Sequence, residues 1–324
     1  KSGKPTLQDW KTLCFLWSSD LRTHIEENRW IDAQGKMEEL ESKWLNKSTK
    51  SSKNSNLISE KRLSNTNKER FIELKTPNQA LKLDLKKGLS LREWSVNENS
   101  LLGTIPHGYF EDISLAADYF SCHSVIEPQG EHKITDLVDV EAWVDDEKDD
   151  FIYAGMQFDN NGYSFGKKYS IHRKRKEFSV EQIIEISNRN KSLNRSCHFT
   201  ILPGIWEESS FYYETALGGN RLEHFNFGNK TIDHTQNLNQ LVSAKHGLGV
   251  TNGEIRIGDS KNFLTFTHDP CEAALVPHLQ YLPKKNGLYL LRLIYSAQEL
   301  DETFKVSSAP QIIKHKITVN AEND

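Results

Sequence analysis

The chain has 324 residues and a formal net charge of −4, and 36% of its residues are hydrophobic and 27% charged. This composition is typical of a soluble globular protein with one or two sizeable cores. The small negative charge gives no general reason to expect nucleic acid or an anionic membrane as a partner. No stretch approaches the roughly 18 consecutive apolar residues of a membrane span, so we expect neither partner.

The first 46 residues carry a helical pattern. Apolar side chains recur near a spacing of three to four residues, with Glu and Lys between them, at Trp10, Leu13, Cys14, Trp17, Leu21, Ile25, Ile31, Met37, Leu40 and Trp44. We predict a helical segment over residues 1–46, made of two helices or one broken helix. Isolated helices of this length are marginal in water, so the segment needs a surface to pack on.

Residues 47–68 are rich in Ser, Asn and Lys and contain few large apolar residues. Such a composition does not offset the conformational entropy that is lost on ordering, which predicts a flexible linker and a domain boundary.

From residue 69 to 324 the hydrophobic period changes to two. About fourteen short segments rich in aromatic and β-branched residues are separated by Gly, Asn, Asp or Pro, as in FIYAGMQF (151–158) and LYLLRLIYSA (288–297). This pattern predicts a mainly β fold, a large antiparallel β-sandwich preceded by the short helical segment. A barrel would need a regular repeat, which the sequence lacks.

The four cysteines are scattered, with no C-x-x-C pair, which predicts free thiols in a reducing compartment. The opening residues KSGKPTLQDW lack the apolar core of a signal peptide, so we expect a cytoplasmic protein. The glycine-bearing turns LGGNR (217–221) and GLGVTNG (247–253) do not have the context of nucleotide-binding loops. We therefore expect no cofactor.

Residues 103–127, GTIPHGYFEDISLAADYFSCHSVIE, gather several side chains that could do chemistry. Asp112 and Asp118 could form the carboxyl pair of a glycosidase, and His107 with Tyr109 could abstract a proton. In the structural interpretation His107 and Tyr109 share one face of an extended segment, and the two aspartates form caps or turns. Spacing alone favours that interpretation over sugar or ion binding, and both over catalysis.

A second candidate lies in GIWEESSFYYE (204–214), where Trp206 stands next to Glu207. Aromatic faces beside carboxylates are what sugar sites use, because C–H faces stack on rings and hydroxyl groups bond to charged groups. The alternative is core aromatic residues next to an acidic loop. Single histidines lack partners at metal-ligand spacing and no serine lies in a G-x-S-x-G elbow, so we predict no metal site and no catalytic residue.

Four stretches resemble a known family: LCFLWSSDLRTHIEENRW (13–30), the stretch 103–127, GLGVTNGEIRIGD (247–259) and LRLIYSAQELDETF (291–304). Together they resemble the region downstream of the catalytic barrel in glycoside hydrolases of family 57, whose architecture is shared with family 38 α-mannosidases. In those proteins a barrel is followed by a helical bundle and by a large sandwich related to the galactose-mutarotase-like supersandwiches.

The resemblance implies that residues 1–46 are the remnant of a helical bundle and that residues 69–324 form a galactose-mutarotase-like supersandwich. The family's catalytic carboxylates lie in the barrel, so no residue of this chain inherits a catalytic role. The implied function is that of a C-terminal carbohydrate-associated domain of a glycoside hydrolase-like protein acting on α-glucan-type polysaccharide. Its partners would be carbohydrate and an upstream catalytic domain of the same polypeptide.

Two other functions stay open from the sequence. One is an autonomous sugar epimerase or polysaccharide lyase that uses His107 and Tyr109 with a carboxylate such as Asp112. The other is a purely structural module. The residues expected to contact sugar, if the carbohydrate-associated function holds, are His107, Tyr109, Asp112, Asp118, Trp206 and Glu207.

Overall fold

The computed structural model describes residues 5–17, 27–44, 70–112, 115, 117–146, 150–160, 162–187, 192–219, 221–228, 230–235, 247–298 and 310–323. The chain forms two compact units, Lys1–Asn56 and Leu57–Asp324. The linker predicted at residues 47–68 lies outside the described residues.

The first unit contains two helices, α1 (Leu7–Leu16) and α2 (Glu27–Trp44), as the apolar spacing predicts. Thr6 and Asp9 form a capping box that begins α1, because each side chain accepts a backbone N–H of the other residue. Lys43 of α2 bonds to Asp9 at 2.5 Å. Neither of these helices is long and apolar enough to cross a membrane. Their exposed large apolar side chains are Leu7, Trp10, Leu13, Phe15, Trp17, Trp30 and Ile31.

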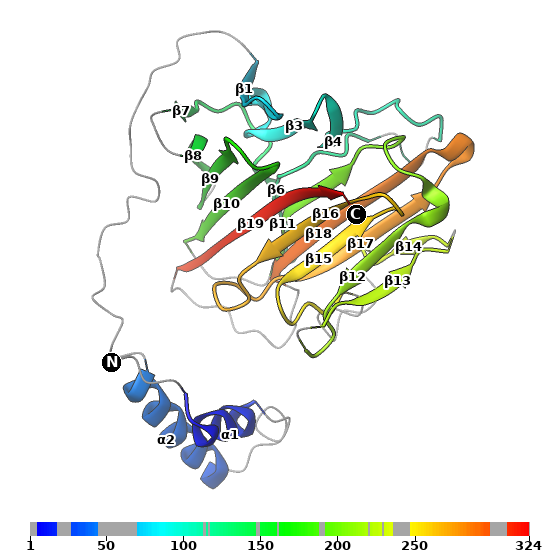
Figure 1. Ribbon diagram of the computed structural model, residues 1–324. Coiled ribbons are helices and arrows are strands. Elements are labelled where there is room, and N and C mark those ends of the chain that lie inside the picture. Colours follow the sequence, from blue (N-terminus) through cyan, green and yellow to red (C-terminus); the bar gives the residue numbers. More distant parts are fainter. Residues whose placement is uncertain are drawn as a thin grey trace. The chain divides into compact units, whose positions relative to one another are not determined.

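The second unit is built on two antiparallel sheets (Figure 1). In the described residues the first sheet has ten strands, of which β5 (Val125–Pro128) pairs with β11 and β6 (Ile134–Thr135) pairs with β5. The others follow the order β1 (Phe71–Lys75), β2 (Gln79–Asp84), β3 (Ser90–Val96), β4 (Asn99–Gly103), β11 (Ser192–Ile201), β18 (Tyr289–Gln298), β17 (Val276–Pro283) and β14 (Ile232–Asp233).

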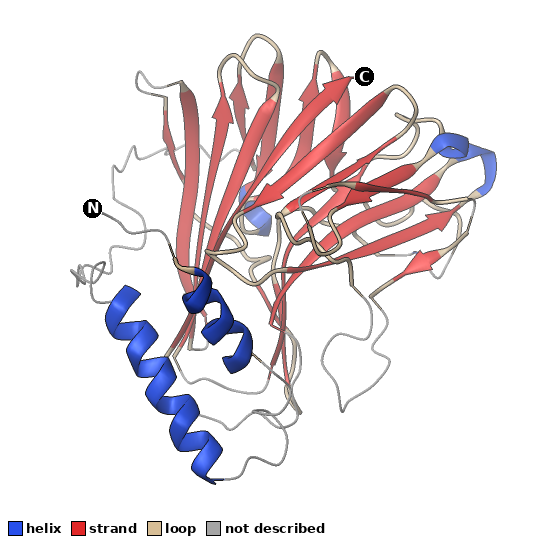
Figure 2. Ribbon diagram, turned by 60° about the horizontal axis from the view of Figure 1, so that its bottom comes forward, coloured by secondary structure: helices blue, strands red, loops and turns tan. Residues whose placement is uncertain are grey.

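The second sheet has nine strands in the described part of the chain. Their order is β13 (Glu223–Asn226), β12 (Tyr212–Thr215), β15 (Glu254–Gly258), β16 (Asn262–His268), β19 (Gln311–Asn323), β10 (Glu177–Ile186), β9 (Tyr163–His172), β8 (Phe151–Asn160) and β7 (Trp143–Asp145). Figure 2 shows the strands of both sheets in red. The predicted mainly β antiparallel sandwich is confirmed.

Aromatic and aliphatic side chains of both sheets fill the space between them. Trp94 of β3 meets Phe178 of β10 edge to face, with 4.8 Å between ring centres. Phe199 of β11 meets Phe266 of β16 at 5.1 Å. All four side chains are fully buried. Because one partner of each pair belongs to each sheet, these contacts make one continuous core across the sandwich.

A charged pair is buried inside this core. Lys167 of β9, in the second sheet, lies 2.9 Å from Asp136, which follows β6 of the first sheet, and both side chains are at most 2% exposed. The Lys167 ammonium also donates to the carbonyl of Gly88 at 2.7 Å. Gly88 has a φ of 57°, and a Cβ there would lie 1.7 Å from the Asp136 carbonyl oxygen, so the turn requires glycine. The pair therefore links the two sheets through polar contacts that water does not screen.

Loss of one member of this pair will destabilise the sandwich strongly. We expect Lys167→Met to lower the free energy of unfolding by about 3–5 kcal/mol, because it leaves a buried carboxylate without its cation. Adding Asp136→Asn to Lys167→Met should recover part of the loss, since the amide oxygen still accepts a hydrogen bond and carries no charge. Urea unfolding followed by tryptophan fluorescence measures both effects.

The matched control is Lys86→Met. Lys86 pairs with Asp139 at the surface, where the two side chains are 57% and 64% exposed. This change should cost less than about 1 kcal/mol. Equal effects of the two lysine substitutions would show that the buried pair is not a determinant of stability.

Candidate functional site

The face of the first sheet that turns away from the core carries polar side chains over β11, β18 and β17. On the core side, Phe199 pairs with Leu293, and Leu293 pairs with Leu279. Phe199, Leu293 and Leu279 thus form one row across the three strands. The two neighbouring rows point outward, because side chains alternate along a strand. One outward row contains His198, Ile294 and His278, and the next contains Thr200, Arg292 and Gln280.

Arg292 lies at the centre of this face without an acidic partner among the described residues. Its Nε donates to Thr200 Oγ1 at 3.2 Å, and one terminal nitrogen donates to the Phe120 carbonyl at 3.4 Å. The guanidinium carbon lies 5.3 Å from the centre of the Tyr119 ring. Removal from water lowers the pKa of Arg292 to about 10, so the group is still charged at neutral pH. Its contacts with the protein leave most of its five N–H donors available.

A β-bulge aims His198 onto this face. The register of β11 against β18 shifts between Ser196 and His198, and Cys197 between them has a φ of 54°. A bulge adds one residue to the strand and changes which side chains follow it to a given face. Cys197 points into the core while His198 points outward beside Ile294.

His198 stacks on a second histidine, His123. The ring centres are 4.0 Å apart, and His198 Nδ1 is 3.1 Å from the carbonyl oxygen of His123. Burial lowers the pKa of both imidazoles well below the ordinary histidine value, and the positive field of Arg292 adds to the effect on each. Both rings are therefore neutral at pH 7. His123 Nδ1 is buried and has no hydrogen-bond partner among the described residues.

The segment that carries His123 is fixed from the core side. The Ser124 N–H donates to Asp136 at 3.0 Å, and the Ser124 hydroxyl donates to Gln182 of β10 at 3.0 Å. Gln182 in turn donates to the carbonyl of Cys122. These contacts hold the residues on both sides of His123, so its ring is positioned by the same network that contains the buried ion pair.

We name the cluster of His123, Arg195, His198, His278 and Arg292 the histidine-arginine face. Arg195 is 9% exposed, and its Nε has no hydrogen-bond partner among the described residues. A buried polar group without a partner is costly, which makes such atoms candidates for contact with a ligand. The donors of this face suit neutral or anionic oxygen atoms.

The accessible edge of the face lies along one row across four strands. Thr200, Arg292, Gln280 and Asp233 are successive partners in the register of β11, β18, β17 and β14. Arg292, Gln280 and Asp233 are partly exposed, as is Tyr119 beside Arg292, whereas His123, His198 and His278 are buried behind them. A ligand would therefore meet the guanidinium, the amide and the carboxylate first.

The structure brings two of the sequence-predicted residues together next to this face. His107 Nδ1 lies 2.8 Å from Asp118 Oδ1, and the His107 backbone N–H donates to the same oxygen at 2.7 Å. Asp112 forms an ion pair with Lys284 at 3.0 Å. Tyr109 is 45% exposed and packs edge to face on Phe110. The loop is joined to the face through Tyr119, since Ile105 and Tyr119 form an antiparallel bridge.

Trp206 and Glu207 lie elsewhere, in the loop that follows β11. Trp206 is 7% exposed and meets Phe211 edge to face at 6.2 Å. The Glu207 backbone N–H donates to Asp259 at 2.9 Å, and its carboxylate accepts from Ser209 at 3.0 Å. Trp206 also lines a cavity.

His198, His123 and Arg292 are not among the site residues that the sequence predicts. The sequence does contain one signal for Arg292: it is the one charged residue in the apolar strand LYLLRLIYSA. Within the described residues, no group of three or more His, Cys, Asp or Glu side chains could hold a metal ion.

In comparisons with known proteins, the chain matches solved structures but no sequence family. No family model matches the sequence, and no curated protein matches it. Solved structures do match: the Slr1438 protein from Synechocystis sp. PCC 6803 superposes with a TM-score of 0.52 and 11% identity, covering 80% of this chain and 97% of that one. The chain shares the fold of that protein, and the low identity carries no more than the fold.

More distant neighbours have TM-scores below 0.5. The α-galactosidase AgaB from Geobacillus stearothermophilus, of glycoside hydrolase family 36, gives 0.46 at 8% identity over 79% of this chain. A putative aldose 1-epimerase from Escherichia coli K12 gives 0.40 at 10% identity, over 78% of this chain and 99% of that one. This chain spans about 40% of the length of AgaB. The resemblance to families 57 and 38 stays a prediction.

The neutral histidines make stability depend on pH in a defined direction. Above about pH 6.5 the imidazoles are neutral in the folded and unfolded chains alike. As the pH falls below that value, the unfolded chain binds protons that the folded chain does not, so each such imidazole lowers the free energy of unfolding by about 1.4 kcal/mol per pH unit. The pKa is lowered for His123, His198, His268 and His315.

We expect His123→Phe to make the loss of stability between pH 6.5 and 5 shallower by about one proton, because the aromatic stacking is retained and the titrating group is removed. Urea unfolding at a series of pH values measures the slope. The control is His132→Phe, at an exposed side chain. Equal slopes for His123→Phe and the unmodified chain would contradict a neutral, buried His123.

Proposed function

We propose that this chain is a carbohydrate-associated β-sandwich domain that binds sugar along the exposed edge of the histidine-arginine face. The observation that carries the proposal is Arg292, a charged guanidinium in the middle of a sheet face with no carboxylate partner among the described residues. An unmatched cation in this position is costly to the fold unless a ligand uses it.

The residues beside Arg292 suit hydroxyl groups, which both donate and accept hydrogen bonds. Gln280 and Asp233 follow at successive positions across the sheet, where the Gln280 amide donates to Thr235 at 3.4 Å and Asp233 Oδ1 accepts the Thr235 N–H at 3.0 Å, so both groups are held in place beside Arg292. Neighbouring strands are about 4.8 Å apart, so the row presents polar groups at intervals comparable to the width of a pyranose ring. The Tyr119 ring adds an aromatic surface next to Arg292.

The finer parts of the proposal follow from the resemblance in sequence. The domain would belong to a glycoside hydrolase-like protein acting on α-glucan-type polysaccharide, with its catalytic barrel in another part of the polypeptide. His107, Tyr109, Asp112 and Asp118 would then contact the sugar or the neighbouring domain from the loop beside the face. The exposed His107 and Asp118 pair suits such a contact, because both side chains are accessible and already oriented toward each other.

A second candidate function is catalysis on a sugar, such as epimerisation. The observation that favours it is the pair of neutral imidazoles, since His123 Nδ1 lacks a partner among the described residues and a neutral imidazole can accept or donate a proton. This pair differs from the His107 and Tyr109 pair suggested by spacing. The Tyr119 hydroxyl is not a base at neutral pH, because burial raises its pKa above the usual value.

Binding is tested with maltooligosaccharides by calorimetry and with insoluble α-glucan by retention. We expect Arg292→Gln to weaken binding at least tenfold, through the loss of charge-assisted hydrogen bonds to sugar oxygens. The matched control is Arg256→Gln, because Arg256 of β15 lies in the second sheet and already pairs with Glu254 at 2.8 Å. Thermal unfolding of both variants monitors folding. No binding by the unmodified chain, or equal binding by both variants, would contradict the proposal.

Catalysis is tested by polarimetry of freshly dissolved glucose and galactose. For a domain that only binds sugar, we expect the rate of mutarotation to equal that of buffer alone. An acceleration that His123→Gln abolishes and His107→Gln does not would replace the binding function with the catalytic one. An acceleration abolished by His107→Gln alone would favour the His107 and Tyr109 pair.

A further inference from the structure

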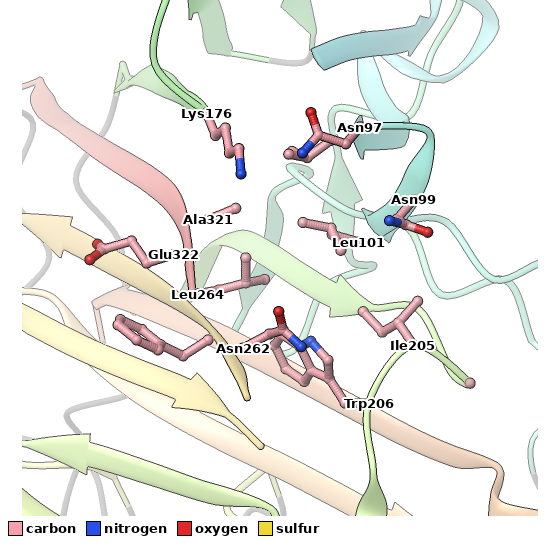
Figure 3. Close-up of a pocket in the computed structure, with 13 residues that line it drawn as sticks. Asn97, Asn99, Leu101, Lys176, Ile205, Trp206, Asn262, Leu264, Ala321 and Glu322 are labelled. Atoms are coloured by element: carbon pink, nitrogen blue, oxygen red, sulfur yellow. The ribbon is translucent and has the colours of Figure 1, made fainter. Parts of the chain in front are cut away.

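A cavity of about 360 Å³ is lined by residues of both sheets and shares no lining residue with the histidine-arginine face. The first sheet contributes the turn from β3 to β4 and the loop after β11, and the second sheet contributes the turn from β9 to β10, the start of β16 and the end of β19. Its volume is at the small end of the range for ligand sites, which fits a monosaccharide unit. Figure 3 shows its lining residues.

The floor of the cavity is apolar and aromatic. Leu101, Ile205, Leu264 and Ala321 line it together with the indole of Trp206. Trp206 is held by its contact with Phe211, so the ring is fixed before a ligand arrives. An indole beside aliphatic side chains offers the C–H faces of a sugar a surface to pack on.

The rim of the cavity is polar. Asn97, Asn99, Asn262 and Lys176 line the cavity, and none of these side chains makes a hydrogen bond or ion pair within the described residues. Figure 3 shows the ammonium of Lys176 and the amide of Asn97 directed toward the middle of the cavity. The Glu322 carboxylate is engaged by Thr265 at 3.1 Å. The rim therefore presents three amides, one cation and one carboxylate that Thr265 holds.

Lys176 differs from its neighbours in the basic run at residues 173–176. Arg173 pairs with Asp146, Lys174 lies 4.0 Å from Asp150, and Arg175 lies 3.3 Å from Glu177. Three of the four cations thus have a carboxylate, whereas the one that lines the cavity has none among the described residues. A cation without a counter-charge at a pocket favours an anionic ligand.

The backbone around the cavity is tied together before binding. Asp259, 3% exposed, accepts the N–H of Glu207 at 2.9 Å and the N–H of Asn262 at 2.8 Å. It therefore locks the loop that carries Trp206 to the turn that carries Asn262. On the other side, the Ala321 N–H donates to the Lys176 carbonyl at 3.0 Å. A rigid site loses little entropy when it binds.

We propose that this cavity binds one acidic sugar unit, a hexuronate, with its ring on Trp206, its hydroxyl groups on the asparagine amides and its carboxylate on Lys176. The site does not depend on Arg292, so it is separate from the sugar-binding edge proposed above. Binding is measured by titrating methyl α-glucuronide and methyl α-glucoside into the full chain. The readout is the indole N–H resonance of Trp206, assigned with Trp206→Phe.

We expect the glucuronide to shift the Trp206 resonance and to bind at least tenfold more tightly than the glucoside. Lys176→Ala should remove this preference, while Lys174→Ala, in the same turn but outside the cavity, should keep it. Asn262→Ala should weaken both ligands. Arg292→Gln should leave the Trp206 titration unchanged, so loss of the α-glucan binding proposed above does not affect this result.

The proposal is overturned if neither sugar shifts the Trp206 resonance, or if both bind equally to the unmodified chain. It is also overturned if Lys174→Ala and Lys176→Ala have the same effect, since the preference would then come from the general charge of the turn. Thermal unfolding of each variant verifies that the chain is folded, and the retained preference in Lys174→Ala serves as the positive control.

Discussion

The arrangement of the sandwich depends on a lysine and an aspartate that pair inside its core. Lys167 comes from one sheet and Asp136 from the other, and neither is exposed to water. Two desolvated charges are tolerated only when their remaining hydrogen bonds are met, and the Gly88 carbonyl and the Ser124 N–H meet them. The pair therefore fixes the positions of residues 88 and 124 relative to β9. Hydrophobic packing alone would allow these positions to vary.

The same network decides where the histidine-arginine face is formed. Asp136 and Gln182 hold the two neighbours of His123, and the bulge at Cys197 turns His198 toward it. The stacked imidazoles are thus positioned by contacts on the core side. Arg292 lies beside them with neutral acceptors, so the positive charge on this face is not cancelled by the protein. One hydrogen-bond network therefore connects the buried ion pair in the core with the histidine-arginine face on the outside of the first sheet.

The strands could be predicted because alternation is a local property, and residues such as those of FIYAGMQF and LYLLRLIYSA follow it. The face could not, for two physical reasons. The bulge at Cys197 changes which side chains of β11 face outward, and the sequence SLNRSCHFTI contains no residue that predicts a bulge. The stacking of His123 on His198 joins positions 75 residues apart in the chain, a contact that spacing cannot show. The pair His107 and Asp118 was within reach of prediction, because a loop closes over eleven residues.

Charge balance distinguishes the two places where this domain could hold a ligand. Several cations of the second unit have a carboxylate within 4 Å, and three of them lie in or beside the positively charged turn from β9 to β10. Arg292 and Lys176 are among the cations that have no such carboxylate in the described residues, and both stand beside an aromatic ring and amide groups. A cation held beside these groups without a carboxylate adds no ion pair to the stability of the fold. In the two proposals an oxygen-rich ligand supplies the missing partner of each cation, and since the two sites share no lining residue, they could be occupied independently.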